Sequence, residues 1–208
     1  MSVLECSGLV TLSQFPLEDE QWVNLSKGDD YATLTDLVLY AEYAVTRKAL
    51  FHTIYINDVM MSTELINSHL TPYNKVETEN RKLREKQAED ICEFSKGREY
   101  RPGVPVVISI LGMDMNDQKI SRPFRAFKRC GFADLFNSNL KNPITFAHPD
   151  NNMVSKTEKP ATLDYIMIKD NMNEMVTIKE MKMETLKTDG GISFSDHESL
   201  FATFEIFE

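Results

Sequence analysis

The sequence is poor in cysteine, with only three among its 208 residues. Cys6, Cys92 and Cys130 lie far apart, and no two of them have the Cys-x-x-Cys spacing of a metal or redox motif. An odd number of widely spaced cysteines gives no disulfide framework. We therefore expect free thiols and a reducing compartment.

The chain also lacks any run of about 18 apolar residues, the minimum for a membrane-spanning helix. Its first residues lack the basic and apolar regions of a signal peptide, so we expect an intracellular protein without a transmembrane segment. An excess of basic charge is missing as well, because the formal net charge is −9. Since binding to phosphates needs clustered Lys and Arg, no stable nucleic-acid partner is expected.

Enough apolar residues are present, 42% of the chain, to fill the core of one domain over residues 1–208. Runs rich in β-branched and aromatic residues predict strands at 8–13, 47–56, 59–66, 104–111, 163–168, 175–181 and 200–207. Helical periodicity predicts helices at 77–95 and 124–131. Residues 17–45 have no clear pattern, and 137–160 are expected to form a loop.

The pair Asn57-Asp58 is typical of a tight turn, so the runs on either side of it predict an antiparallel hairpin. The helix at 77–95 then leads into the apolar run 104–111, which is typical of a strand buried on both faces. Hairpins that alternate with helical crossovers predict a layered α/β (α+β) sandwich.

Polar clusters stand where four of the expected strands meet loops. They are Asn67-Ser68-His69, Asp114-Met115-Asn116, Asp164-Tyr165 and Ser195-Asp196-His197. Each cluster alone is weak evidence, because such short patterns occur by chance. A histidine at the rigid edge of a sheet is nevertheless well placed to act as a general base.

Taken in order, the four clusters resemble motifs of the endonuclease/exonuclease/phosphatase superfamily, which includes deoxyribonucleases, inositol polyphosphate phosphatases and neutral sphingomyelinases. The family patterns are Asn-Thr-His-Leu, Gly-Gly-Asp-x-Asn, Arg-Ile-Asp-Tyr-Ile and Ser-Asp-His. Met113 replaces a small residue in the second pattern, and Thr162 stands where Arg is usual in the third. The resemblance implies a four-layer αββα sandwich of the deoxyribonuclease-like type.

Three further segments resemble the neutral sphingomyelinase branch of that superfamily: Gly8–Pro16, His69–Asn74 and Ser195–Thr203. This resemblance implies magnesium-dependent hydrolysis of sphingomyelin to ceramide and phosphocholine. It also implies sphingomyelin or a related phospholipid as the partner, at a membrane surface on its cytoplasmic face.

The resemblance assigns the hydrolytic centre to three residues. His197 is the general base, and Asp164 fixes the tautomer of its ring, as carboxylates do in other hydrolases. Asp196 reaches the metal ion, Mg²⁺, or the attacking water.

The remaining implied residues act on the phosphate. Asn116 donates a hydrogen bond to it, and Asp114 orients the nucleophile or the Asn116 amide. His69 supplies a second positive or donor group. Lys48 adds charge at the same rim, although a single Lys usually reaches into solvent.

The family's main magnesium ligand, a Glu on an early strand, would lie upstream of Gly8. Two strands, a helix and their loops need about 50 residues, and Glu5 is too close to Gly8 to replace that ligand. We therefore expect an N-terminally incomplete version of a longer enzyme that is inactive as this chain alone. Loss of the metal ligand in the lineage is the other possibility.

Two other functions stay open on the same scaffold. One is a nuclease or an inositol polyphosphate phosphatase, and the other is a catalytically dead module that binds phosphate or lipid. His52 and His148 match no motif, and we expect structural roles for them.

Overall fold

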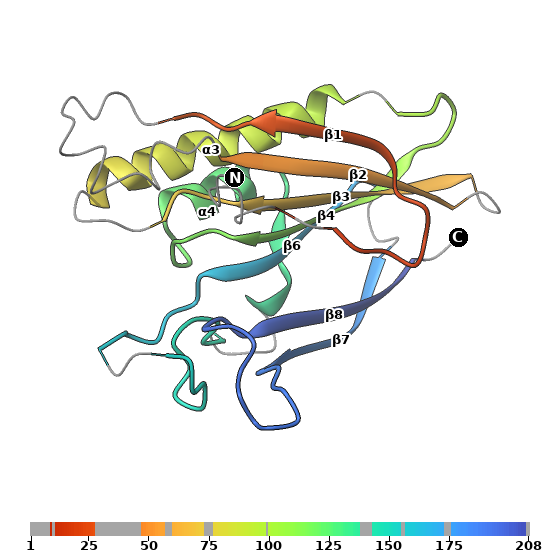
Figure 1. Ribbon diagram of the computed structural model, residues 1–208. Helices are drawn as coiled ribbons and strands as arrows, with labels where there is room; N and C mark the ends of the chain where they lie inside the picture. The colour runs from red at the N-terminus through yellow and green to blue at the C-terminus, as the bar shows by residue number, and fades with distance from the viewer. Residues whose placement is uncertain are drawn as a thin grey trace, which may run out of the picture.

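The computed structural model describes residues 9, 11–27, 47–56, 60–72, 77–98, 100–137, 143–154, 157–172 and 176–206. These residues form a six-stranded sheet, a two-stranded sheet and two α-helices (Figure 1). In chain order the elements are β1 (Glu18–Asn24), β2 (Lys48–Ile56), β3 (Met61–His69), α3 (Glu77–Gly97), β4 (Val106–Asp114), α4 (Arg122–Arg129), β5 (Ala133–Asp134), the 3₁₀ helix η2 (Leu135–Asn137), β6 (Asp164–Asp170), β7 (Val176–Glu184) and β8 (Ser199–Ile206).

The strand order in the larger sheet is β1-β2-β3-β4-β6-β5. β2 and β3 are antiparallel, with Phe51 opposite Ile66, so the expected hairpin is confirmed. Its Asn57-Asp58 turn lies outside the described residues. β3 and β4 are parallel, because α3 carries the chain back between them as a crossover helix. β6 then pairs antiparallel with β4.

The hydrophobic core lies between this sheet and the two helices. Phe51, Ile66 and Leu111 from three strands pack against Ile91 of α3 and Phe127 of α4, and all five are almost fully buried. Side chains alternate between the two faces of a strand. The last residues of β3 and β4 and the first of β6 therefore face away from the helices.

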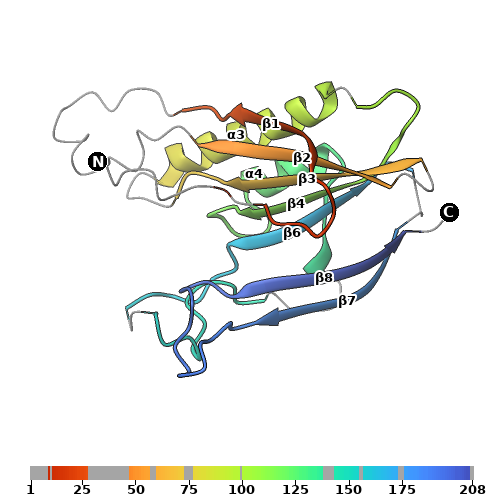
Figure 2. The same cartoon turned by 45° about the vertical axis from the view of Figure 1, so that its right-hand side comes forward.

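The second sheet, β7 with β8, lies across from the helices and beside β6 (Figures 1 and 2). In β8 the side chains of Leu200 and Phe204 are half-buried, whereas Phe201 is exposed. The described part of the chain thus contains three layers of the expected sandwich: one layer of helices and two sheets. None of the described helices is long and apolar enough to span a bilayer.

The first strand differs from the expectation. Residues 9 and 11–13 are not in a strand, and β1 begins instead at Glu18, in a stretch without a clear sequence pattern. β1 forms because its backbone pairs with β2 at the edge of the sheet. Charged residues are common on such edge strands, because they discourage further pairing.

The expectation of free thiols is wrong for two of the three cysteines. Cys92 of α3 and Cys130, which follows α4, form a disulfide with a Cα–Cα distance of 6.2 Å. The two cysteines are 38 residues apart, and only the packing of α3 against α4 brings them together. The sequence argument for a reducing compartment therefore loses its basis. Cys6 lies outside the described residues.

Candidate active site

Three of the candidate residues stand in one row across neighbouring strands. His69 at the end of β3 is paired with Asp114 at the end of β4, and Asp114 is paired with Asp164 at the start of β6. Because these residues share a register, all three side chains lie on the face opposite the helices. The parallel and antiparallel pairings thus bring together motifs that are almost 100 residues apart in the sequence.

His197 reaches this row from the loop before β8. Its Nδ1 lies 2.8 Å from Asp164 Oδ2, and its ring packs on Phe146 with 5.0 Å between ring centroids. Ser195 Oγ accepts the His197 backbone N–H at 3.0 Å, and Thr145 Oγ1 accepts the Asp164 N–H at 3.0 Å. The ring is therefore fixed through its Nδ1 atom and through its packing on Phe146. Thr145 and Phe146 lie in the expected loop and were not among the candidates.

The charge of His197 depends on its carboxylate neighbours. Burial lowers the pKa of His197, but the hydrogen bond to Asp164 and the negative charges of Asp164, Asp114 and Asp196 outweigh burial and raise this pKa to about 9. Without a nearby cation the imidazole is thus protonated at neutral pH.

His69 has the opposite electrostatic balance. Burial, together with the positive charges of Arg47 and His197, lowers the pKa of His69 to about 4, so its ring is neutral at pH 7. Its Nε2 lies 3.3 Å from Asp114 Oδ2. Of the two roles expected for His69, a positive group or a donor, only the donor is available at neutral pH. Burial and the charge of Asp164 raise the pKa of Asp114 to about 7.

Asp114 holds the backbone of Asn116. Asp114 Oδ1 accepts the Asn116 N–H at 2.8 Å, and Asn116 adopts a left-handed conformation with φ of 52°, which Asn tolerates better than most residues. Asn116 Nδ2 donates one hydrogen bond to Leu70 O at 3.1 Å. An amide group has a second N–H, which could serve a bound phosphate oxygen.

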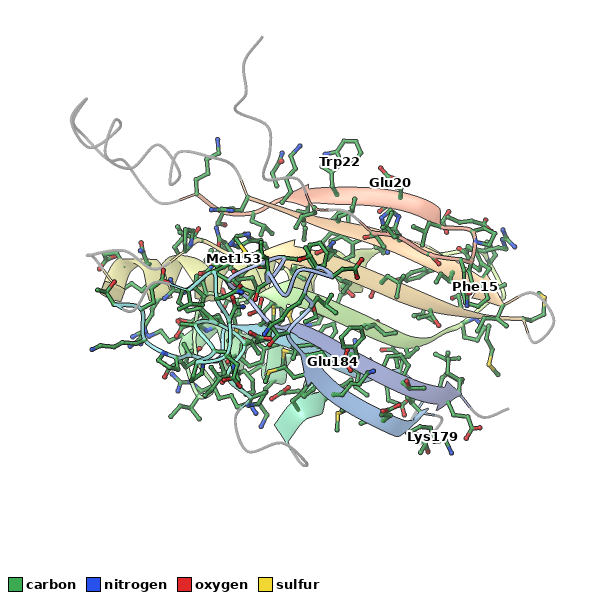
Figure 3. All side chains as sticks on the ribbon, turned by 60° about the horizontal axis from the view of Figure 1, so that its bottom comes forward. Phe15, Glu20, Trp22, Met153, Lys179 and Glu184 are labelled. Carbon is green, nitrogen blue, oxygen red and sulfur yellow. A yellow bond between two sulfur atoms is a disulfide. The ribbon has the colours of Figure 1, made fainter. Side chains whose placement is uncertain are left out.

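Lys48 lies at the same end of the sheet, but its ammonium is 5.7 Å from the ring centroid of Trp22. Trp22 stands on β1 at the outer edge of the sheet, where Figure 3 shows it beside Glu20. Arg47, the preceding residue, helps burial to lower the pKa of His69, and its charge partly opposes the rise in the pKa of Asp114. We missed Arg47 in the sequence, although its position next to Lys48 was a usable signal.

The site offers a modest set of ligands for a divalent cation. Ligand atoms of Asp114, Asp164 and His197 lie within 4.8 Å of one another, and Asp196 is not part of this group. Mg²⁺ prefers carboxylate oxygens and retains several waters, so the two aspartates fit it. Asp164 Oδ2 is already bonded to His197, which leaves few free oxygens. A cavity of about 240 Å³ adjoins the group and is also lined by Asn67 and Glu198.

No protein-family model and no curated protein matches the chain. Solved structures do match. TDP2 from D. rerio, complexed with a single strand DNA product, has a TM-score of 0.62 and 17% identity, over 91% of this chain and 68% of that one. Beta toxin 275–280 from Staphylococcus aureus has a TM-score of 0.64 and 18% identity, over 92% of this chain and 65% of the toxin. An endonuclease/exonuclease/phosphatase from Bacteroides vulgatus has a TM-score of 0.59 and 15% identity, over 92% and 66%.

The chain therefore has the deoxyribonuclease-like endonuclease/exonuclease/phosphatase fold, as the motifs in its sequence led us to expect. It spans about two thirds of the length of these three structures.

Proposed function

We propose that this chain is part of a magnesium-dependent phosphodiesterase that hydrolyses sphingomyelin, or a related phospholipid, to ceramide and phosphocholine. The observation that carries the proposal is the 2.8 Å contact of His197 with Asp164, in the row that also holds Asp114 and His69. Attack of water on phosphorus needs a base, donors to the non-bridging oxygens and usually a divalent cation.

Each role has a residue. His197 Nε2 takes the proton of the attacking water, and Asp164 stabilises the imidazolium that forms. His69 and the Asn116 amide donate hydrogen bonds to the phosphate. A Mg²⁺ ion beside Asp114 and Asp164 would neutralise charge on the phosphate oxygens.

A bound cation should also make His197 a better base. A divalent charge next to the imidazole disfavours its protonated form, so we expect Mg²⁺ to lower the pKa of His197 from its value of about 9. NMR titration of the His197 ring with and without Mg²⁺ measures this, with KCl at the same ionic strength as the control. An unchanged pKa at saturating Mg²⁺ would contradict the placement of the cation.

Exposed apolar side chains near His197 support a lipid substrate. The segment 186–194, which we call the hairpin, lies between β7 and β8 and is closed by the Lys187–Ser193 bridge. Leu186, Ile192 and Phe194 are 44%, 60% and 68% exposed. Apolar side chains that stand in water just before a reactive residue favour contact with the surface of a lipid bilayer.

The hairpin can be tested separately from the chemistry. The double substitution of Ile192 and Phe194 with serine should lower the rate on sphingomyelin vesicles by about tenfold, because less apolar surface is buried in the lipid. The rate on a short-chain soluble substrate should fall much less. Met172→Ser, at an apolar position that is 44% exposed just beyond β6, is the control. Equal losses on vesicles and on the soluble substrate would argue against lipid contact.

A nuclease is the second candidate, because the similar TDP2 structure holds a single strand DNA product. That comparison does not support our expectation that nucleic acid is no partner, although the net charge of −9 still disfavours a long basic groove. Parallel assays of the full-length protein on sphingomyelin vesicles, single- and double-stranded DNA and inositol phosphates decide between the candidates. Hydrolysis of DNA alone would overturn the lipid proposal.

Location at the cytoplasmic face of a membrane stays a prediction.

A further inference from the structure

We infer that two consecutive asparagines, Asn151 and Asn152, are positioning residues with separate tasks: Asn151 fixes the segment that carries His197, and Asn152 fixes the hairpin. The inference rests on the proposed function for what the two parts do. Neither residue belongs to a motif of the sequence analysis, and both lie in the loop between η2 and β6.

Asn151 is 5% exposed and uses its whole amide group. Its Nδ2 donates to Ser195 O at 2.8 Å and to Glu198 Oε1 at 3.0 Å, and its Oδ1 accepts the Met153 N–H at 3.0 Å. Ser195 and Glu198 are the residues on either side of Asp196-His197. One buried amide thus holds both ends of the segment that presents the base.

The same segment is held on its other side by Thr145. Thr145 O accepts the Glu198 N–H at 2.7 Å, and Thr145 Oγ1 accepts the Asp164 N–H at 3.0 Å. Thr145 therefore links Glu198 to the carboxylate that His197 contacts. When the Asn151 bonds are removed, the Ser195 end of the segment keeps only the longer backbone bond from Ala147 N–H to Asp196 O at 3.4 Å, and the distance between His197 and Asp164 is less well fixed.

Asn152 makes a different pair of bonds. Its Nδ2 donates to Gly191 O at 2.9 Å, and its Oδ1 accepts the Ser193 N–H at 2.9 Å. These two bonds lie on either side of Ile192, one of the exposed apolar residues of the hairpin. Lys187 Nζ adds a bond from the hairpin to Asp150 O at 3.2 Å. The loop thus sets the position of the hairpin relative to the base.

Kinetics of the full-length protein on sphingomyelin vesicles test this division. We expect Asn151→Ala to lower kcat by about tenfold with little change in KM, and Asn152→Ala to raise KM by about fivefold with little change in kcat. Asn171→Ala is the matched control, because Asn171 also donates a side-chain hydrogen bond, to Ser109 Oγ at 3.2 Å, beyond the far end of β6. Changes in kcat and KM that are the same for both variants would overturn the inference.

Two further variants guard against misfolding. Asn151→Ser removes the two amide N–H bonds without adding a charge beside Glu198, so it should reproduce the loss in kcat if Asn151→Ala does not fold. Asn152→Asp keeps the acceptor for Ser193 and should recover part of the KM. If an Asn151 variant loses kcat while Ser195 and Glu198 keep their positions, the assigned contacts of Asn151 are not the cause of the loss.

Amide hydrogen exchange separates this inference from the proposed function. Asn152→Ala should speed exchange at the Ser193 N–H, whereas Asn151→Ala should speed it at the His197 and Glu198 N–H groups. These readings need no activity. If the wild type hydrolyses no phosphodiester, the proposed function fails. The exchange pattern still tests whether Asn151 and Asn152 fix separate segments. Faster exchange at the same amides in both variants would refute the division.

Discussion

Replacement of His197 with alanine is expected to lower kcat/KM of the full-length protein by at least about 100-fold, the usual contribution of a general base. The imidazole is held by Asp164 at 2.8 Å and by its packing on Phe146. Alanine has no group that can accept a proton at this position. The measurement is the rate on sphingomyelin vesicles, with circular dichroism to verify folding.

His148→Ala is the control for this substitution. His148 lies in the loop before β6, and its side chain is as buried as that of His197. Its Nδ1 accepts only a local hydrogen bond in the described contacts, from the Asp150 N–H at 3.3 Å. We expect its removal to change kcat/KM by less than about threefold. A folded His197→Ala protein that keeps the activity of the wild type would eliminate the assignment of the base.

The alignment of the candidate residues His69, Asp114 and Asp164 in one row depends on the ends of strands, which the sequence indicates. The periodicity of β3, β4 and β6 is clear in the sequence, and each of these strands has a polar cluster at one end. Once the crossover through α3 makes β3 and β4 parallel, His69 and Asp114 must fall at the same edge of the sheet. The order of the elements therefore predicted a layered sandwich, whereas its deoxyribonuclease-like type was expected from the motif resemblance.

Other parts of the fold could not be predicted, because they depend on tertiary contacts. The stretch that forms β1 is acidic and has no alternating apolar pattern, and only its pairing with β2 makes it a strand. The disulfide between Cys92 and Cys130 depends on how α3 packs on α4. In both cases the deciding partner is remote in the sequence.

Side-chain direction limited the site prediction in the same way. Lys48 was expected to add charge at the rim of the site, yet its ammonium lies over Trp22, while the charge of Arg47 acts on His69 and Asp114. Thr145 and Asn151 lie in a loop without periodicity, where no pattern indicates which backbone groups a side chain will bind. Loops of this kind carry function through contacts that only coordinates reveal.

Asp164→Asn is expected to reduce the maximal rate by about 100- to 1000-fold, because a neutral amide stabilises the imidazolium of His197 far less than a carboxylate does. The same change should move the pH profile. Asp164 is the main group that raises the pKa of His197 to about 9, so the acid limb of kcat/KM should shift to lower pH in the variant. A loss of rate without a shift of this limb would mean that Asp164 acts on something other than His197.

Stability gives a second reading of the same contact. The folded pKa of His197, about 9, lies above its ordinary value of 6.5, so protonated His197 stabilises the folded state fully below pH 6.5. This contribution decreases as the pH rises and is lost above the folded pKa. Asp164→Asn should therefore lower the free energy of unfolding more at about pH 6 than at about pH 10. Urea denaturation of both proteins at the two pH values measures the difference, and an equal loss at both would show that the charged pair does not stabilise the fold.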